Sequence, residues 1–270
     1  MKPYLALLSA RFRQGLQYRA AAWAGAATQV CFGLFIISAL EAFAAARPGA
    51  AGPFSRVASY VWLGQALFRL LPWNPDPELR DVVRLGDVGL QLAKPLDLYG
   101  AWFAKALGYR LSAATLRALP CLLASAVLLP LVGLGGIALG PPDSVLSALA
   151  FAAALPGAVL LSAAITTLYP ILYFRSVSAS GAMTIAAAAA SLCGGILAPL
   201  PLLPPWMGDA LALTPFAFVT DAPFRIWTGM VPPSDILRVL AMQAAWLAIC
   251  VVLGRAWLGR RLLGVEIAGG

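Results

Sequence analysis

The 270-residue chain is far more apolar than a soluble domain: 61% of its residues are hydrophobic and 11% are charged, whereas soluble domains carry roughly 25% charged residues. It contains no histidine, which excludes imidazole general bases, histidine-containing catalytic triads and histidine-ligated zinc. The net charge is +8. Because the basic residues lie beside apolar segments, we attribute them to membrane orientation and anionic lipid headgroups and expect no nucleic-acid partner. The composition predicts an all-α integral membrane protein.

The first segments of the chain differ sharply in character. Residues 1–19 combine four basic residues with leucines and aromatic residues, which predicts an N-terminal interfacial amphipathic helix on the cytoplasmic face. The apolar run at 20–43 is long enough for the roughly 20 residues that cross a bilayer core. It is too long for the apolar part of a signal peptide, so we expect it to be retained as the first span. A second span is expected at 54–71, with Arg56 and Arg69 reaching the headgroups at opposite ends.

Segment 72–112 is the only long run in which charges are dense, and apolar stretches flank it on both sides. It begins with the signals of a short helix: Asp76 is a candidate N-cap, Pro77 suits the first helical position and Gly86 is a natural C-terminal stop. A short basic helix tethered between two spans is an element by which a membrane protein touches a soluble partner. The alternative interpretation is an interfacial loop that is basic because cytoplasmic loops usually are.

The second half of this segment is expected to change conformation. Apolar and small or polar residues alternate over 88–93, which predicts a short extended piece. Pro95 keeps Lys94 out of the α region and prolongs the extension. Asp97 then caps a new helix that runs towards Arg110.

The rest of the chain is expected to hold four more spans, at 113–139, 144–174, 182–203 and 236–258. Asp143 is the candidate cap of the fourth. The stretch at 204–235 has too many prolines for one span and is too apolar for a free loop. It predicts short outer-face or re-entrant helices, which are stable only where protein or water satisfies their backbone groups.

The distribution of basic residues sets the orientation of these spans. Six spans with both termini in the cytoplasm place most of the 19 basic residues on the cytoplasmic side, as the positive-inside rule requires. We therefore expect residues 1–270 to form a single transmembrane domain with segment 72–112 in the cytoplasm.

Two sequence patterns point to a known family. From residue 83 the chain reads VRLGDVGLQLAKP, and residues 213–229 read LTPFAFVTDAPFRIWTG. The first resembles the loop after the second span of ABC-2 type permease subunits of ABC transporters, and the second resembles the outer segment of that family. The matching positions are Val83, Arg84, Gly86, Asp87, Leu92, Lys94 and Pro95 in the loop, and Pro215, Phe216, Pro223 and Gly229 in the outer segment.

The resemblance extends in order over essentially the whole chain, although Val265 stands where the family's short ending has an aromatic residue. It implies the membrane subunit of an ATP-driven exporter in the bacterial cytoplasmic (inner) membrane. Such a subunit works with separate ABC ATPase subunits and with a second permease subunit, identical or paralogous. ATP and Mg²⁺ would be bound by the ATPase, so this chain would carry no cofactor and would not itself be an enzyme.

The resemblance also assigns a role to the short helix after Asp76, which in this family docks on the ATPase. We expect Arg80, Asp81, Arg84 and Asp87 to supply the polar contacts, with Leu79 and Val83 packed into a groove of the partner. The predicted coupling residues are Leu79, Arg80, Asp81, Val83, Arg84, Gly86, Asp87, Lys94 and Pro95.

Other chemistry has little support in the sequence. None of the three lysines lies in a G-x-x-x-x-G-K-[ST] loop, so the chain cannot bind ATP in the P-loop manner. The span centres hold almost no ionisable residues to couple ion flow, and the four cysteines lack metal-ligand spacing. Two alternatives remain: an intramembrane enzyme using Asp76, Asp81 and Asp87, and a membrane scaffold or assembly factor that docks without driving transport.

Overall fold

The computed structural model describes residues 1–46, 53–174 and 180–263, and every regular element in these ranges is helical. Four of the described helical stretches are long and apolar enough to cross a membrane. They are α2 (Arg19–Ala46), α6 (Leu98–Leu123) with its continuation, α8 (Val145–Leu172) and α12 (Ile236–Leu262). The prediction of an all-helical, multi-pass membrane protein is confirmed at this level.

Two of the six expected spans are much shorter than predicted. The regions 54–71 and 182–203 contain α3 (Phe54–Ala66) and α9 (Ser180–Cys193), of 13 and 14 residues. At about 1.5 Å per residue, each covers about 20 Å of a hydrocarbon core that is about 30 Å thick. α3 breaks at Leu67 and continues only as the 3₁₀ turn η1 (Phe68–Leu70).

The irregular chain after α3 is buried, and neighbouring helices satisfy its backbone carbonyls. Arg110 of α6 donates to the carbonyls of Arg69 and Leu71 at 3.1 and 3.2 Å. From α8, Ser162 and Tyr169 donate their hydroxyls to the carbonyls of Leu70 and Pro72. Non-helical backbone is tolerated inside a membrane protein only where protein or water supplies such partners, so this connection is a structural part of the bundle.

The third predicted span is joined to the helix before it. α6 begins at Leu98, where the Asp97 side chain accepts a hydrogen bond from the Gly100 N–H at 2.8 Å. It then runs past Arg110 without a break. Neither proline nor glycine separates the two expected helices, and the Ser112 hydroxyl donates back to the Tyr109 carbonyl at 3.0 Å instead of capping a new helix. A π-helical stretch, η2 (Ala124–Leu128), leads into α7 (Leu129–Leu131), so the helix ends eight residues before the expected 139.

The predicted cap of the fourth span is also wrong. Ser144, and not Asp143, is the N-cap of α8, and its Oγ accepts from the Ser147 N–H at 3.1 Å. The Asp143 carboxylate instead pairs with Arg56 in the first turn of α3, at 2.8 Å. Aspartate and serine are similarly good N-caps, so the long-range ion pair decides between two adjacent candidates.

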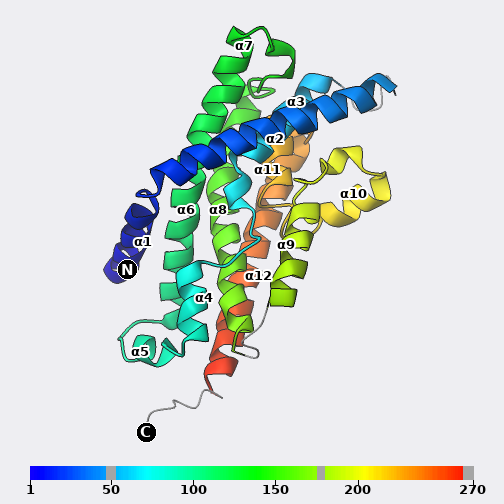
Figure 1. Cartoon of the computed structure of the whole chain (residues 1–270). Helices are drawn as coiled ribbons and strands as arrows, with labels where there is room; N and C mark the ends of the chain where they lie inside the picture. Colours follow the sequence, from blue (N-terminus) through cyan, green and yellow to red (C-terminus); the bar gives the residue numbers. More distant parts are fainter. Residues whose placement is uncertain (47–52, 175–179, 264–270) are drawn as a thin grey trace.

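The long helices meet around a shared core. α8 packs against both α6 and α12, while α2 crosses α3 and α6 obliquely (Figure 1). α1 (Lys2–Gly15) lies against α6, at the end of the molecule where α12 finishes and where the short helices α4 (Pro77–Arg84) and α5 (Val88–Leu92) project (Figure 1). The chain's first helix, the end of its last helix and the charged segment therefore lie in the same half of the molecule (Figure 1).

The stretch at 204–235 forms short helices, as the sequence predicts. They are α10 (Pro205–Ala212), α11 (Asp221–Trp227) and the 3₁₀ turn η5 (Pro233–Asp235). α11 is buried against α3 and α8, and its Phe224 meets Tyr60 edge-to-face with ring centroids 5.5 Å apart. This stretch is therefore integrated into the bundle.

Candidate functional site

The helix predicted after Asp76 is present as α4. The Asp76 carboxylate caps it by accepting from the Glu78 N–H at 3.0 Å, Pro77 is its first residue, and Gly86 follows it with a φ of +81°. A positive φ is readily adopted only by glycine, so the stop signal works as expected. The predicted extended piece at 88–93 is wrong, because residues 88–92 form the short helix α5.

One face of α4 is built into the protein's own core. Leu79 is fully buried in a cluster with Val88, with residues of α6 such as Trp102, and with Ile171 of α8 and Leu258 of α12. Val82 and Val83 are partly buried against the same cluster. Leu79 therefore has no exposed surface for a groove on another protein, and we no longer assign it to a partner contact. Burying an aliphatic side chain stabilises by about 1.5–3 kcal/mol, which fixes α4 on three long helices.

The opposite side of α4 and α5 is exposed. We call this surface the tip, and it comprises Arg84, Leu85, Gly86, Asp87, Leu90, Leu92, Lys94 and Pro95. Its two most exposed leucines, Leu85 and Leu90, have 75% and 72% of their surface accessible. Five of the nine predicted coupling residues lie on this tip. Large exposed apolar side chains grouped with charges are typical of an interaction surface.

Two further predicted coupling residues, Arg80 and Asp81, bond to each other beside the tip. The Arg80 Nε donates to the Asp81 carboxylate at 2.9 Å, and both side chains are well exposed. This hydrogen bond lowers the pKa of Asp81. Exposed ion pairs of this kind contribute at most about 1 kcal/mol to stability. Either side chain could therefore leave this pair and bind a group on another protein.

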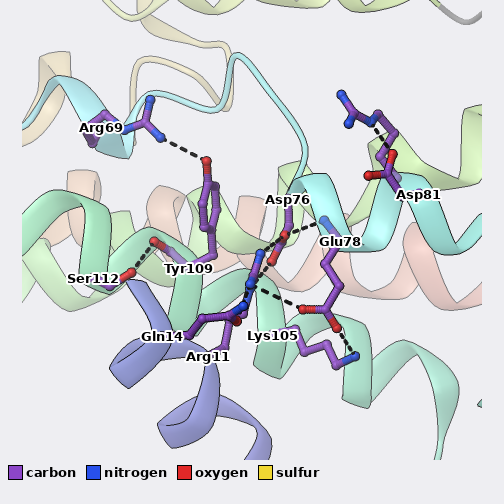
Figure 2. A network of polar contacts seen from close by, with 10 residues as sticks. Arg11, Gln14, Arg69, Asp76, Glu78, Asp81, Lys105, Tyr109 and Ser112 are labelled. Carbon is purple, nitrogen blue, oxygen red and sulfur yellow. Dashed lines mark hydrogen bonds and ion pairs between the residues drawn. The ribbon is translucent and has the colours of Figure 1, made fainter. Parts of the chain in front are cut away.

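A polar network, drawn in Figure 2, ties α4 to α1 and α6. Arg11 of α1 donates through Nε to the Asp76 carboxylate at 2.9 Å and through Nη2 to its other oxygen. Glu78 lies between Arg11 and Lys105 of α6, at 3.3 and 2.7 Å. Burial raises the pKa of Asp76, and the bonds from Arg11 oppose that rise. The sequence predicts Asp76 as a helix cap and as a candidate carboxylate of the alternative enzyme, but it does not indicate this network, because Arg11 is 65 residues away.

Next to this network lies a cavity of about 350 Å³ between α1, α2 and α6. Its polar lining includes Arg11, Arg69, Tyr109 and Arg117. Arg69 donates to the Tyr109 hydroxyl at 3.0 Å. Among the described residues, neither Arg69 nor Arg117 has an ion-pair partner within 4 Å. The cavity is therefore electropositive. No local pattern in the sequence indicates that these arginines lie close together.

A second buried polar group lies in the 204–235 stretch. Tyr60 of α3 donates to the Asp221 Oδ1 at 2.6 Å, while Asp221 Oδ2 has no hydrogen-bond partner in the described part of the chain and lies 3.6 Å from Arg225. Burial raises the pKa of Asp221 to about 6. Asp221 and Arg225 line a cavity of about 390 Å³ beside α12.

The four residues of the predicted outer motif do not line up in one site. Phe216 packs against the main core, and Pro223 is buried in α11. Gly229 has a φ of +68°, and a methyl group there would lie 2.3 Å from the Asp143 carboxyl carbon. Pro215 is partly buried. Their surroundings account for these residues as packing and turn positions.

Comparison with protein-family models, with curated proteins and with solved structures finds no match to this chain. Among the described residues, no group of three or more histidine, cysteine, aspartate or glutamate side chains is placed to hold a metal ion. The candidate site is thus defined by geometry alone. It consists of the exposed tip, an electropositive cavity, and the buried cluster in which Leu79 and Val88 pack on α6, α8 and α12, which we call the mount.

Proposed function

We propose that this chain is the permease subunit of an ABC-2 type exporter in a bacterial cytoplasmic membrane. ATP hydrolysis takes place on separate ATPase subunits, and a second permease subunit, identical or paralogous, completes the transport path. The observation that carries this proposal is the tip. It presents the family-like residues Arg84, Gly86, Asp87, Lys94 and Pro95 on an exposed surface that is mounted on the long helices.

The construction of the mount suits the transmission of force. Leu79 and Val88, from α4 and α5, share one buried cluster with residues of α6, α8 and α12. The Trp102 indole also donates to the Gln91 side chain at 2.7 Å, which fastens α5 to α6. Protein interiors are close-packed and transmit displacement. A push on the tip would therefore move three long helices together.

The proposal includes six crossings of the membrane with both termini in the cytoplasm. The two short helices α3 and α9 complete the count together with the irregular segments that follow them. Ten consecutive residues of α3, Val57–Ala66, are buried, which agrees with a discontinuous span enclosed by protein. Most of the described basic residues then lie on the same side as the tip, as the positive-inside rule favours.

The decisive experiment is co-purification with the ATPase encoded beside the gene, followed by reconstitution in vesicles. We compare the wild-type chain with Arg84→Glu and with a matched control, Arg260→Glu. Arg260 is also exposed, lies in the last turn of α12 and is outside the tip. Arg84→Glu is expected to lower the transport-coupled ATPase rate at least tenfold, while membrane insertion and the control rate stay unchanged.

Each result assigns the function differently. A stable ATPase complex with an unaltered rate in Arg84→Glu would refute the role of the tip. A stable complex without ATP-dependent flux would favour the scaffold alternative, which uses the same surface. Failure to form a complex under co-expression would refute the permease function.

A further inference from the structure

The cavity between α1, α2 and α6 has the arginine-rich lining that an anion requires. The nearby acids are already neutralised, since Asp76 and Glu78 pair with Arg11 and Lys105. This leaves two further lining arginines, Arg69 and Arg117, without a carboxylate within 4 Å among the described residues. Two like charges facing one partly enclosed space repel each other more than they would in water. A bound anion removes that cost.

A third positive charge lies behind the cavity. Arg110 is fully buried, and its bonds go to backbone carbonyls and to the Asn74 amide oxygen rather than to a carboxylate. It therefore adds positive charge to the region without neutralisation by an acid. The Arg110 guanidinium lies 5.8 Å from the ring centroid of Tyr109, which lines the cavity.

Both unpaired arginines are positioned by their neighbours. Arg69 lies over the rings of Trp73 and Tyr109, at 5.8 and 5.9 Å from the ring centroids, and its buried Nε has no hydrogen-bond partner in the described residues. The Arg117 guanidinium lies against α2 where Gly25 leaves room for it, since a methyl group at Gly25 would be 2.5 Å from Arg117 Cζ. Planar guanidinium groups fixed in this way suit the oxygen atoms of a phosphate.

The remaining lining points to an amphiphile rather than a free ion. Ala21, Ala22 and Leu116 also line the cavity, and α2, which supplies the two alanines, exposes large apolar side chains such as Trp23, at 64%. The headgroup of a lipid could occupy the basic cavity, and its acyl chains could contact the apolar surface of α2. Basic cavities between transmembrane helices on the cytoplasmic side are known to bind anionic lipid headgroups.

We infer that this cavity binds the phosphate group of an anionic membrane lipid, with Arg69 and Arg117 as its ligands and the acyl chains along α2. The volume of about 350 Å³ lies within the range of about 300–1,000 Å³ that small-molecule sites occupy. The inference goes beyond the proposed transport function and does not depend on it. It concerns lipid binding by this chain, with or without an ATPase partner.

The test uses the full chain, purified in detergent and stripped of lipid. Binding of phosphatidylglycerol and of zwitterionic phosphatidylcholine is measured by native mass spectrometry. The variants are Arg69→Gln, Arg117→Gln and Arg117→Lys, with Arg13→Gln as control, since Arg13 is an exposed basic residue of α1 outside the cavity. Each cavity Gln variant is expected to lose about fivefold in phosphatidylglycerol affinity, because one basic residue near a membrane surface contributes about that factor.

The controls separate binding from folding. Arg117→Lys keeps the charge but not the planar guanidinium, so it should lose less affinity than Arg117→Gln. Melting temperatures without lipid should show that the variants remain folded. Equal phosphatidylglycerol affinity in Arg69→Gln, Arg117→Gln and Arg13→Gln, or no preference over phosphatidylcholine in the wild type, would overturn the inference. Equal binding of soluble glycerol phosphate would support a phosphate site but overturn a membrane lipid as its source.

Discussion

The buried carboxylate of Asp221 should make the stability of the protein depend on pH in an unusual direction. Its pKa is raised by burial from the ordinary 3.8 to about 6, a shift of roughly 2 units, which corresponds to about 3 kcal/mol. Because the folded protein binds this proton more tightly than the unfolded chain, the stabilisation is fully present below about pH 4. It is lost as the pH rises through about 6.

The perturbation that tests this is Asp221→Asn, which keeps an oxygen to accept from Tyr60 and removes the charge. At pH 4 the variant should match the wild type, and at pH 8 it should be more stable by up to about 3 kcal/mol. The pKa of about 6 already includes the attraction of Arg225, which lies 3.6 Å away and opposes the rise.

The assay is thermal unfolding of the purified chain in detergent from pH 4 to pH 8, compared with Asp209→Asn. Asp209 lines the same cavity but is exposed, so its replacement is the matched control for removing a carboxylate that is not buried. For a protein of this size 1 kcal/mol corresponds to roughly 2–4 °C, which makes the expected difference readily measurable. A wild-type and Asp221→Asn pair whose melting difference does not change between pH 4 and pH 8 would refute the reasoning.

Two further substitutions test the mount and the packing of α1. Leu79→Ala should destabilise the fold by about 2–5 kcal/mol, because it empties a fully buried site, whereas Leu90→Ala on the exposed tip should change the melting temperature little; equal effects would contradict the assignment of Leu79 to the core. Gly108→Ala places a methyl group 2.6 Å from the backbone oxygen of Leu8 and should loosen α1 at a cost of about 1–3 kcal/mol. Limited trypsin digestion at the arginines of α1 should then be faster, while Gly259→Ala, which meets nothing within 4 Å, should leave the rate unchanged.

Local chemistry in the sequence predicts the helix boundaries best. Asp76, Pro77, Gly86 and Asp97 all act as their residue types suggest, because capping and positive φ are decided within a few residues. The alternation at 88–93 led to a wrong prediction because six residues are too few to separate a strand from one helical turn. There the burial of Val88 against α6, with Leu90 and Leu92 left exposed, decides in favour of helix.

Span lengths and charge pairings depend on contacts that no local pattern records. α3 ends early because α6 and α8 supply hydrogen bonds to the chain after it, so the backbone is free to leave the helix inside the bundle. The Tyr60–Asp221 bond joins residues 161 positions apart. The sequence indicates this bond only by placing an aspartate within an apolar stretch. Arg110 is likewise a charged residue among apolar neighbours in α6. Buried polar residues of this type need partners, but the sequence does not name them.

The tip and the cavity share one element, and this constrains how either can work. Pro77 lines the cavity, Asp76 just before it is bound to Arg11 of α1, and Leu79 two residues later lies in the core beneath the tip. α4 is therefore anchored at its first turn on the cavity side and along its apolar face on the bundle side. A displacement of the tip must carry α1 and the cavity wall with it or break the Arg11–Asp76 pair, and breaking a buried pair costs about 3–5 kcal/mol. We therefore expect a displacement of the tip to carry α1 and the cavity wall with it, so that α4 links a contact at the tip to the shape of the cavity.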